Sequence, residues 1–318
     1  MNKALAALLV AAAPLVAQAQ SWPDRPVKIV VPFGPGGFTD VAARILQKEL
    51  GASLGQAVII ENKPGAGSTI GTAEVANAKP DGYTLAMIST THVISPHLYK
   101  QIPYDPIKGF TPVMKLAEGP YVLVVHPSLA ARNVAELIAL AKAQPGTIDY
   151  ASSGNGSAQH LVGALFNSSA GVKLNHVPYK GSNQAMNDVI AGNVKVSFVG
   201  VPNALPNLPS GKLRALGVST AKRYAELPDV PAIAEAGVPG YDATVWLGLL
   251  APAGTPREVV QRINTEIGKV LSTPEARKLM SSAGVDVSIA GSEDFGKLIA
   301  SELGRWGKVV RETGATVN

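Results

Sequence analysis

Glycines and hydroxyl side chains follow strand-like segments of this chain in loops that could bind an anion. Residues 27–40, VKIVVPFGPGGFTD, pass from strand-forming residues through Gly36 and Gly37 to the start of an amphipathic run. Glycines let a ligand approach the backbone closely, and free N–H groups at a helix start attract negative charge. We expect Thr39 or Asp40 to cap this helix. A tight turn between a buried strand and its helix would explain the same residues without a ligand.

Two later loops repeat this arrangement. In SSGNGSAQH we expect Ser153, Gly156 and Ser157 to offer backbone or hydroxyl donors to an oxyanion. In VPYKGSNQA, Lys180 supplies a cation, and Tyr179 supplies an apolar wall or a hydrogen-bond donor. A structural turn and a solvated lysine are compatible with the same two stretches.

The sequence offers little support for catalysis, metal binding or nucleotide binding. The spacing G-x-S-x-G is absent, and Ser157 followed by His160 does not make a catalytic triad, because triad partners are set by tertiary geometry. No H-E-x-x-H and no cysteine-based metal site occurs, and neither G-x-x-x-x-G-K-[ST] nor G-x-G-x-x-G is present. We therefore predict a protein that is not an enzyme and that uses no metal or other cofactor.

Strands that alternate with helices would position these loops. The first part of the chain contains predicted strands at 27–31, Val58–Ile60 and Tyr83–Ser89, with helices between them. Such alternation implies a parallel sheet with helices on both faces, and ligands bind beyond the carboxyl ends of its strands. The third strand ends in a hydroxyl-rich tip at 89–92, so three consecutive strand ends carry glycines or hydroxyls.

The second part of the chain repeats the alternation. We expect Pro103–Pro112 to be a connecting loop, Tyr121–Val125 to cross to a second lobe, and Trp246–Pro256 to return the chain to the first. We therefore predict an α/β protein with a first lobe at 20–120 and 246–318 and a second lobe at 121–245. The predicted C-terminal helices are Arg257–Leu271, Pro274–Ala283 and Ser292–Thr313, capped by Thr255, Thr273 and Ser292.

The N-terminus predicts export. Lys3 precedes an apolar run at 4–16, and residues 17–19 form an A-x-A cleavage signal, so we expect a signal peptide at 1–19. The chain has no cysteine, which excludes disulfides and a lipid-modified N-terminal cysteine. Its formal net charge of +5 comes from scattered basic residues, so we expect no nucleic-acid partner. These features predict a soluble periplasmic protein.

Eight motifs of the chain together resemble those of one family: PFGPGGFTD, NKPGAGSTIG, PYDPIKGFTPV, SSGNGSAQHL, VPYKGSNQA, SGKLRALGVST, LPDVPAIAEAGVPGY and LLAPAGTP. The chain is similar throughout its mature length to the Bug (TctC) family, the extracytoplasmic solute receptors of tripartite tricarboxylate transporters. The resemblance implies a type II periplasmic binding-protein fold, in which two α/β lobes with parallel-rich sheets are joined by a two-strand hinge. It also implies a small carboxylate ligand and a membrane permease as partner.

The resemblance also implies a set of ligand-binding residues. They belong to the glycine loop after the first strand, the tip of the third strand, and two loops of the second lobe. These residues are Phe33, Gly36, Gly37, Phe38, Thr39, Asp40, Ser89, Thr90, His92, Ser153, Gly154, Asn155, Ser157, His160, Tyr179, Lys180 and Gly181.

One departure from the family pattern concerns the ligand. Many members carry an Asp directly after the position of Phe198, whereas this chain has Val199 and Gly200. We expect this difference to disfavour an amino-acid ligand, and Phe38 to leave room for an aromatic or alkyl carboxylate. We expect a monomeric receptor. A periplasmic sensor that signals to a membrane kinase and a secreted hydrolase remain as alternatives.

Overall fold

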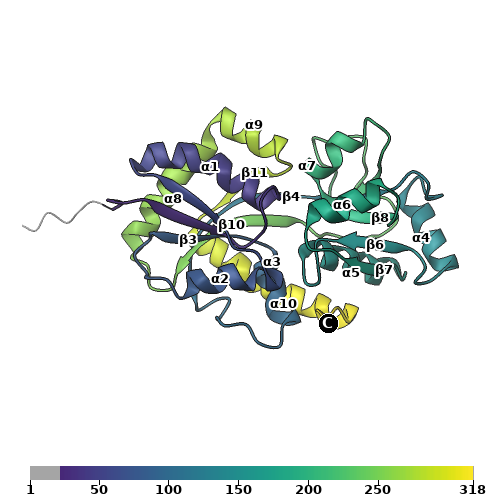
Figure 1. The fold of residues 1–318 in the computed structure, drawn as a ribbon, viewed down its shortest axis with the longest axis horizontal. Coiled ribbons are helices and arrows are strands. Elements are labelled where there is room, and N and C mark those ends of the chain that lie inside the picture. The colour runs from purple at the N-terminus through teal and green to yellow at the C-terminus, as the bar shows by residue number, and fades with distance from the viewer. Residues whose placement is uncertain (1–21, 318) are drawn as a thin grey trace, which may run out of the picture.

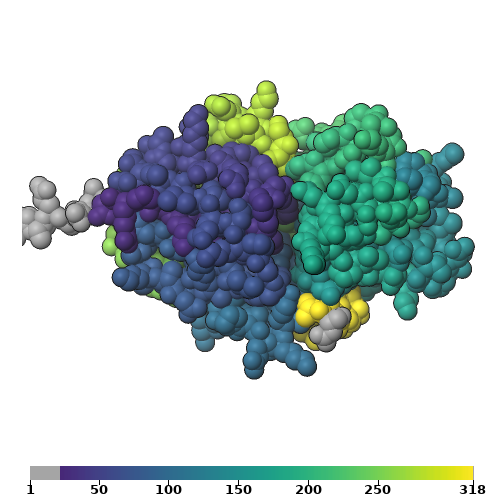
Figure 2. Space-filling model, in the orientation of Figure 1, coloured from purple at the N-terminus to yellow at the C-terminus, as the bar shows by residue number. Residues whose placement is uncertain are grey.

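The structure, a computed structural model, describes residues 22–317, so the predicted signal peptide lies outside the described part. Two β-sheets organise these residues into two lobes that lie side by side (Figure 1). We call the part built on the six-stranded sheet the first lobe and the part built on the five-stranded sheet the second lobe. The lobes meet along a narrow seam in the space-filling view (Figure 2). No helix in 22–317 is long and apolar enough to cross a membrane.

The sheet of the first lobe is mixed. Its strands, in spatial order, are β11 (Asp286–Ala290), β4 (Phe110–Gly119), β10 (Val245–Pro252), β3 (Thr84–Ser89), β1 (Val27–Val31) and β2 (Val58–Asn62). The β1 strand pairs in parallel with β2 and β3, whereas β10 and β4 pair antiparallel with their neighbours. Along β1, Ile29 and Val31 pack into one hydrophobic cluster and Val30 into another, because alternate side chains point to opposite faces.

Helices cover both faces of this sheet (Figure 1). One face carries α1 (Phe38–Leu54), α8 (Arg257–Ser272) and α9 (Pro274–Ser282). The other face carries α2 (Thr69–Ala76), α3 (Thr91–Leu98) and α10 (Ser292–Thr313), and a short 3-10 helix at Ala66–Ser68 precedes α2.

The sheet of the second lobe is also mixed. Its strands, in spatial order, are β7 (Asn175–Pro178), β6 (Asp149–Ser152), β8 (Val196–Gly200), β5 (Tyr121–Val125) and β9 (Arg214–Val218). Two pairs are parallel, and the two pairs that β5 makes are antiparallel. The helices of this lobe are α4 (Val134–Ala143), α5 (Ala158–Ala170), α6 (Ser182–Ile190) and α7 (Val201–Ala204), followed by a 3-10 helix at Leu205–Asn207.

Two segments of the chain pass between the sheets and run beside each other. The first joins β4 to β5 through Pro120, and the second leads from β9 to β10. Gly119 pairs with Val245 at this point. Ser219 joins the segments, because its Oγ accepts a hydrogen bond from the Tyr121 N–H (2.9 Å) and donates one to the Ala243 carbonyl (2.9 Å).

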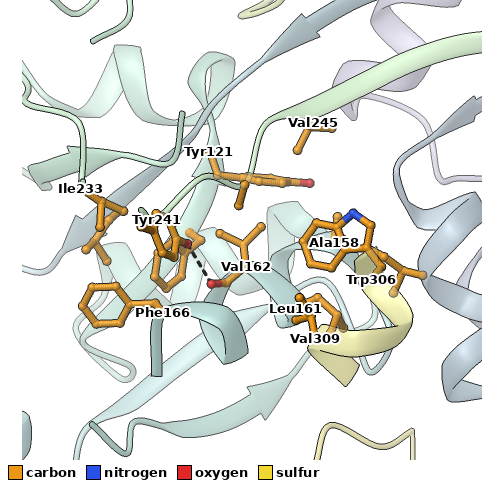
Figure 3. Close-up of a cluster of buried hydrophobic side chains, with 14 of the residues drawn as sticks. Tyr121, Ala158, Leu161, Val162, Phe166, Ile233, Tyr241, Val245, Trp306 and Val309 are labelled. Atoms are coloured by element: carbon orange, nitrogen blue, oxygen red, sulfur yellow. Dashed lines mark hydrogen bonds between the residues drawn. The ribbon is translucent and has the colours of Figure 1, made fainter. Parts of the chain in front are cut away.

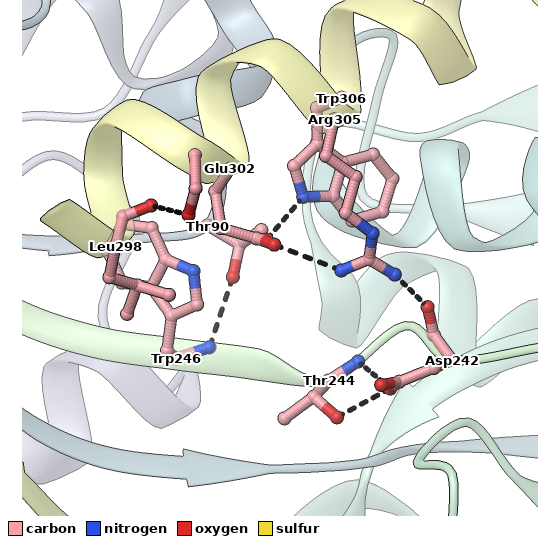
Figure 4. Close-up of polar contacts among 9 residues, drawn as sticks. Thr90, Asp242, Thr244, Trp246, Leu298, Glu302, Arg305 and Trp306 are labelled. Atoms are coloured by element: carbon pink, nitrogen blue, oxygen red, sulfur yellow. Dashed lines mark hydrogen bonds and ion pairs between the residues drawn. The ribbon is translucent and has the colours of Figure 1, made fainter.

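Helix α10 adds a further connection between the lobes. Trp306 and Val309 pack in the same hydrophobic cluster as Leu161 of α5, a helix of the second lobe (Figure 3). Arg305 donates a hydrogen bond to the Asp242 carbonyl in the second crossing segment (Figure 4). The C-terminal helix therefore contacts the first lobe, the second lobe and the segment that joins them.

Several local features differ from those that the sequence predicts. Antiparallel pairing is more extensive than in the predicted parallel-rich sheets, because the crossing strands β4, β5, β9 and β10 pair antiparallel with their neighbours. The sequence does not predict α3 or β11, and β4 begins inside the stretch 103–112 that we expected to be a loop.

Of the caps predicted for the three C-terminal helices, one is present and two are not. Thr273 caps α9 as predicted, accepting a hydrogen bond from the Ala276 N–H. The caps predicted at Thr255 and Ser292 are wrong, because these hydroxyls donate instead to the carbonyls of Pro252 and Pro112.

Candidate functional site

A cleft of ≈ 430 Å³ lies between the lobes. This volume is within the range of small-molecule binding sites. Loops from both lobes line the cleft, and they come from the carboxyl ends of β1, β2, β3, β6 and β7. No aspartate or glutamate belongs to the lining, and Lys180 is its one cationic side chain among the described residues. The cleft is therefore suited to an anion.

The N-terminus of α1 opens into this cleft without a side-chain cap. Gly37 is the N-cap residue, and its extended backbone (φ −77°, ψ 161°) leads into a helix that begins at Phe38. The N–H groups of Phe38, Thr39 and Asp40 donate to no described residue. The prediction that Thr39 or Asp40 caps this helix is therefore wrong. Three backbone donors and the positive end of the helix dipole remain available to a ligand.

Asp40 lies behind the loop rather than in the cleft. Its carboxylate is 2% exposed and accepts hydrogen bonds from the Gly36 N–H (3.0 Å), Arg44 Nε (2.9 Å) and Asn62 Nδ2 (2.8 Å). Burial raises the pKa of Asp40, but the hydrogen bonds from Arg44, Gly36 and Asn62 outweigh it and hold the pKa below its usual value. Asp40 and Gly36, both expected to bind the ligand, instead fix the shape of the glycine loop.

The second lobe presents a comparable helix start. Gly181 precedes α6 without a side-chain cap, and the N–H groups of Ser182, Asn183 and Gln184 donate to no described residue. A Cβ added at Gly36 of the first lobe would lie 3.8 Å from the side-chain nitrogen Nδ2 of Asn183. The two uncapped helix starts therefore approach each other across the mouth of the cleft.

A strained loop forms another part of the wall. Ala66 (φ 44°) and Ser68 (φ 75°) have left-handed backbone conformations that residues with side chains rarely adopt. Gly65, Gly67 and Ser68 line the cleft, and Ser95 of α3 donates a hydrogen bond to the Gly67 carbonyl (2.5 Å). Strained backbone persists only where the surrounding contacts hold it in place, and such residues are concentrated at ligand sites.

The loop SSGNGSAQH is largely occupied by its own hydrogen bonds. The Ser153 N–H donates to Gln159 Oε1 (2.8 Å), and the Gly156 N–H donates to His160 Nδ1 (3.2 Å). These two backbone groups, predicted as oxyanion donors, already have partners. Ser157 accepts a hydrogen bond from the His160 N–H as the N-cap of α5, and its hydroxyl donates to no residue in 22–317.

Two stacked histidines support this loop from behind. The rings of His160 and His176 lie 3.9 Å apart and nearly parallel, and His176 Nε2 contacts Ser152 Oγ at 2.6 Å. Burial lowers the pKa of His160 to about 4. Burial, followed by the effect of His160, lowers the pKa of His176 to about 3. Both rings are neutral at pH 7, so they position the loop and supply no positive charge.

The tip of β3 divides between the cleft and the interior. Ser89 lines the cleft. Thr90 Oγ1 instead accepts a hydrogen bond from the Trp246 N–H (3.0 Å; Figure 4). His92 lies buried beside Tyr104, with its Nε2 2.8 Å from the Pro106 carbonyl oxygen, and burial lowers its pKa to about 4. Thr90 and His92 therefore face away from the cleft, whereas Thr91 between them lines it.

The structure brings a subset of the predicted site residues together. Those that line the cleft are Phe33, Gly37, Phe38, Thr39, Ser89, Ser153, Asn155, Ser157, Lys180 and Gly181. Those outside the lining are Gly36, Asp40, Thr90, His92, Gly154, His160 and Tyr179. The Tyr179 hydroxyl donates to Asp188 (2.6 Å), and Gly154 (φ 130°) provides a left-handed turn.

Further lining residues were not among the predicted ligand-binding residues, although some of them lie in the predicted loops. The glycine-rich stretch after β2 is the clearest signal, since it follows a strand as the other loops do. The added residues are Pro32, Gly34, Pro35, Pro64, Gly65, Gly67, Ser68, Thr91, Tyr121, Ala158, Ser182, Asn183 and Gln184.

Val199, which follows Phe198 where many family members have an Asp, does not face the cleft. Val199 is buried in the hydrophobic cluster of the second lobe with Val122 and Ala185. The interpretation of Val199 as a ligand-facing position is therefore wrong. The prediction of a ligand without an ammonium group rests instead on the lining of the cleft, which contains no acidic side chain.

The profile of the TctC family, described as "Tripartite tricarboxylate transporter family receptor", matches residues 42–315. The chain belongs to the TctC family. Protein BugT of Bordetella pertussis is 38% identical to it over 299 residues, covering 93% of this chain and 92% of BugT. The family consists of receptors rather than enzymes, and the predicted relationship is confirmed.

Solved structures of TctC-type proteins share this fold. An R. palustris protein, solved with adipate, is 36% identical with a TM-score of 0.88, covering 93% of this chain and 99% of that chain. MatC of Rhodopseudomonas palustris, solved with malate, is 33% identical with a TM-score of 0.84, covering 91% and 100% respectively. The predicted two-lobed α/β binding-protein fold is confirmed.

Proposed function

We propose that this TctC receptor works in the periplasm, captures a small organic carboxylate between its lobes, and delivers it to the permease of a tripartite tricarboxylate transporter. One observation carries the proposal. The uncapped starts of α1 and α6, on opposite lobes, open into a cleft that has no acidic side chain in its lining.

These helix starts suit a carboxylate for physical reasons. A carboxylate accepts several hydrogen bonds, and backbone N–H groups at a helix start point outward with a favourable dipole. Closure of the lobes removes the ligand from water, which strengthens these hydrogen bonds. The solved TctC relatives that contain adipate and malate support the same ligand class.

The direct contacts that we propose come from the lining of the cleft. In the first lobe, Phe38 and Thr39 line the cleft and offer the N–H groups of the α1 start, which Gly37 precedes as the N-cap. In the second lobe, Gly181 leads into the donors of α6, and Lys180 adds positive charge at the exposed rim. An amino acid would bring an ammonium group into a lining that has no carboxylate to pair with it, so we propose a ligand without one.

The proposed location follows from the N-terminal sequence and from the family. Residues 4–16 and the A-x-A signal at 17–19 are typical of a cleavable export signal. The TctC family supplies extracytoplasmic receptors to membrane permeases, so we propose that the mature chain, 20–318, meets its permease in the periplasm. Its lobes, with boundaries near 120 and 245, would then move as units about the two crossing segments.

A ligand screen tests the function. The mature protein is melted with malate, adipate, hexanoate and benzoate, and with glutamate and glucose as controls. A ligand that binds only the folded state at a hundredfold excess over its Kd stabilises it by about 2.7 kcal/mol, which raises Tm by several degrees. We expect a rise with one or more of the carboxylates. A rise with glucose and with none of the carboxylates would refute the proposal.

A second experiment tests delivery. Uptake of the radiolabelled carboxylate is measured in cells that express the permease with and without this receptor. We expect uptake only when both are present. Normal uptake without the receptor, despite tight binding in vitro, would favour a sensory role over transport.

A further inference from the structure

Tyr121 is held rigidly at the point where the chain enters the second lobe. It is the first residue of β5, directly after the crossing at Pro120. Its N–H donates to Ser219 Oγ (2.9 Å), and its carbonyl accepts from the Ser219 N–H (2.8 Å). The backbone of Tyr121 is therefore fixed to both crossing segments rather than to a loop.

The side chain of Tyr121 lines the cleft and is only 5% exposed. Its ring meets the ring of Phe38 edge to face, with centroids 6.2 Å apart. The ring extends toward Ala158, at the start of α5, with the hydroxyl at its far end (Figure 3). This hydroxyl makes no hydrogen bond to any residue in 22–317, so its proton is available to a molecule in the cleft.

Other hydroxyls belong to the same end of the cleft. Ser89 and Thr91 line it, are almost completely buried, and share a hydrogen bond between their hydroxyl oxygens (3.3 Å). Ser89 pairs with Leu247, close to the pairing of Val245 with Gly119 at the crossing. The part of the cleft near the crossing therefore carries three hydroxyl groups, and the Phe38 ring, at the start of α1, packs against Tyr121 there.

A buried tyrosine hydroxyl is better suited to donate than to accept at this position. Burial raises the pKa of Tyr121 well above its usual value, so the phenol keeps its proton across the physiological range. A ligand that fills the cleft displaces water from this hydroxyl, and a ligand oxygen that accepts its proton avoids leaving the donor unpaired. No other described side chain offers such an oxygen to it.

We propose that the Tyr121 hydroxyl determines ligand specificity by donating a hydrogen bond to a second oxygen group of the bound carboxylate. This inference rests on the proposed function, in which the helix starts hold the first carboxylate. The ligand class is then a bifunctional acid, such as a dicarboxylate, rather than a simple alkyl acid. Because Tyr121 is fixed at the hinge, the contact would set the length of ligand that the closed cleft accepts.

Matched acids test this contact by calorimetry. The probes are the diacids succinate, glutarate and adipate, each compared with the monoacid of equal chain length: butyrate, valerate and hexanoate. We expect wild type to prefer the diacid of the best-binding pair. Tyr121→Phe removes only the hydroxyl, and we expect it to weaken diacid binding about tenfold or more while monoacid binding is unchanged.

Tyr104→Phe is the control variant. The Tyr104 hydroxyl is buried and has no hydrogen-bond partner among the described residues, and Tyr104 does not line the cleft. We expect Tyr104→Phe to bind every probe as wild type does. Melting curves without ligand check that both variants fold, and we expect Tyr121→Phe to melt close to wild type because it breaks no internal hydrogen bond.

The outcomes separate the two proposals. Equal binding of diacid and monoacid by wild type, or equal weakening of both by Tyr121→Phe, would overturn the role of Tyr121 and leave the carboxylate receptor intact. Binding of monoacids alone would do the same. Failure of every carboxylate, in this series and in the wider screen, would overturn both proposals.

Discussion

Substitution of Gly37 by valine should abolish ligand binding and preserve the fold. Gly37 lines the cleft and precedes the uncapped start of α1. Its backbone (φ −77°, ψ 161°) is accessible to any residue, and an added Cβ would lie 3.9 Å from its nearest neighbour, the Gly34 carbonyl oxygen. The branched side chain therefore fits the protein but occupies space in the cleft.

The expected magnitudes follow from this geometry. Replacement of an N-cap glycine by an apolar residue costs about 1 kcal/mol of unfolding free energy or less, which lowers Tm by about 2–4 °C. Each hydrogen bond to a charged group contributes about 1.5–3 kcal/mol, so loss of even one weakens binding roughly 10- to 150-fold. Gly37→Val should therefore change affinity far more than stability.

A second glycine provides the control. Gly291 is also an N-cap residue without a side-chain cap, its backbone is similar (φ −66°, ψ 174°), and it lies outside the cleft. Calorimetry with the carboxylate found in the ligand screen, and melting curves without it, should show similar stability losses for Gly37→Val and Gly291→Val. Only Gly37→Val should lose binding. Normal binding by Gly37→Val would refute the role of the α1 start as an anion site.

Three further substitutions test the supporting structure. Asp40→Asn should destabilise the protein by about 1–3 kcal/mol at pH 7. Because the folded pKa of Asp40 is lowered, this difference from wild type should be complete above about pH 4 and disappear at lower pH in denaturant titrations. His176→Phe should keep the stack on His160 but make the free energy of unfolding fall less steeply from pH 6.5 toward pH 4. The reason is that the pKa of His176 is lowered in the folded protein, so the unfolded chain binds the proton first. An unchanged dependence of the unfolding free energy on pH would contradict this. Ser219→Ala leaves the Tyr121 N–H unpaired and should cost about 1–3 kcal/mol in chemical denaturation, whereas wild-type stability would show that the crossing does not need this bond.

Local patterns in the sequence predict the strand–loop–helix units well. Strands β1, β3, β5 and β6, together with α1 and α5 after the glycine and serine loops, lie where hydrophobic periodicity and turn residues place them. The region of the cleft was predictable for the same reason, because the carboxyl ends of parallel strands meet at one edge of a sheet.

Hydrogen-bond partners from distant segments were not predictable. Asp40 has the position of a helix cap in the sequence, but Asn62 and the Gly36 N–H bind its carboxylate in the folded protein. His92 follows the third strand, where a ligand-binding residue is expected, but its ring contacts the Pro106 carbonyl instead. Tyr121 reads as an ordinary strand residue, and only the meeting of the two lobes places its ring in the cleft.

Because α10 packs on both lobes and holds the second crossing through Arg305, the lobes have few independent ways to move relative to each other. Lobes joined only by flexible strands would lose considerable orientational entropy when a ligand draws them together. In this protein the fold itself removes much of that freedom before any ligand arrives. The entropic cost of binding is then smaller, so more of the free energy of a few backbone hydrogen bonds remains as affinity. This favours tight binding of a small ligand that buries little surface.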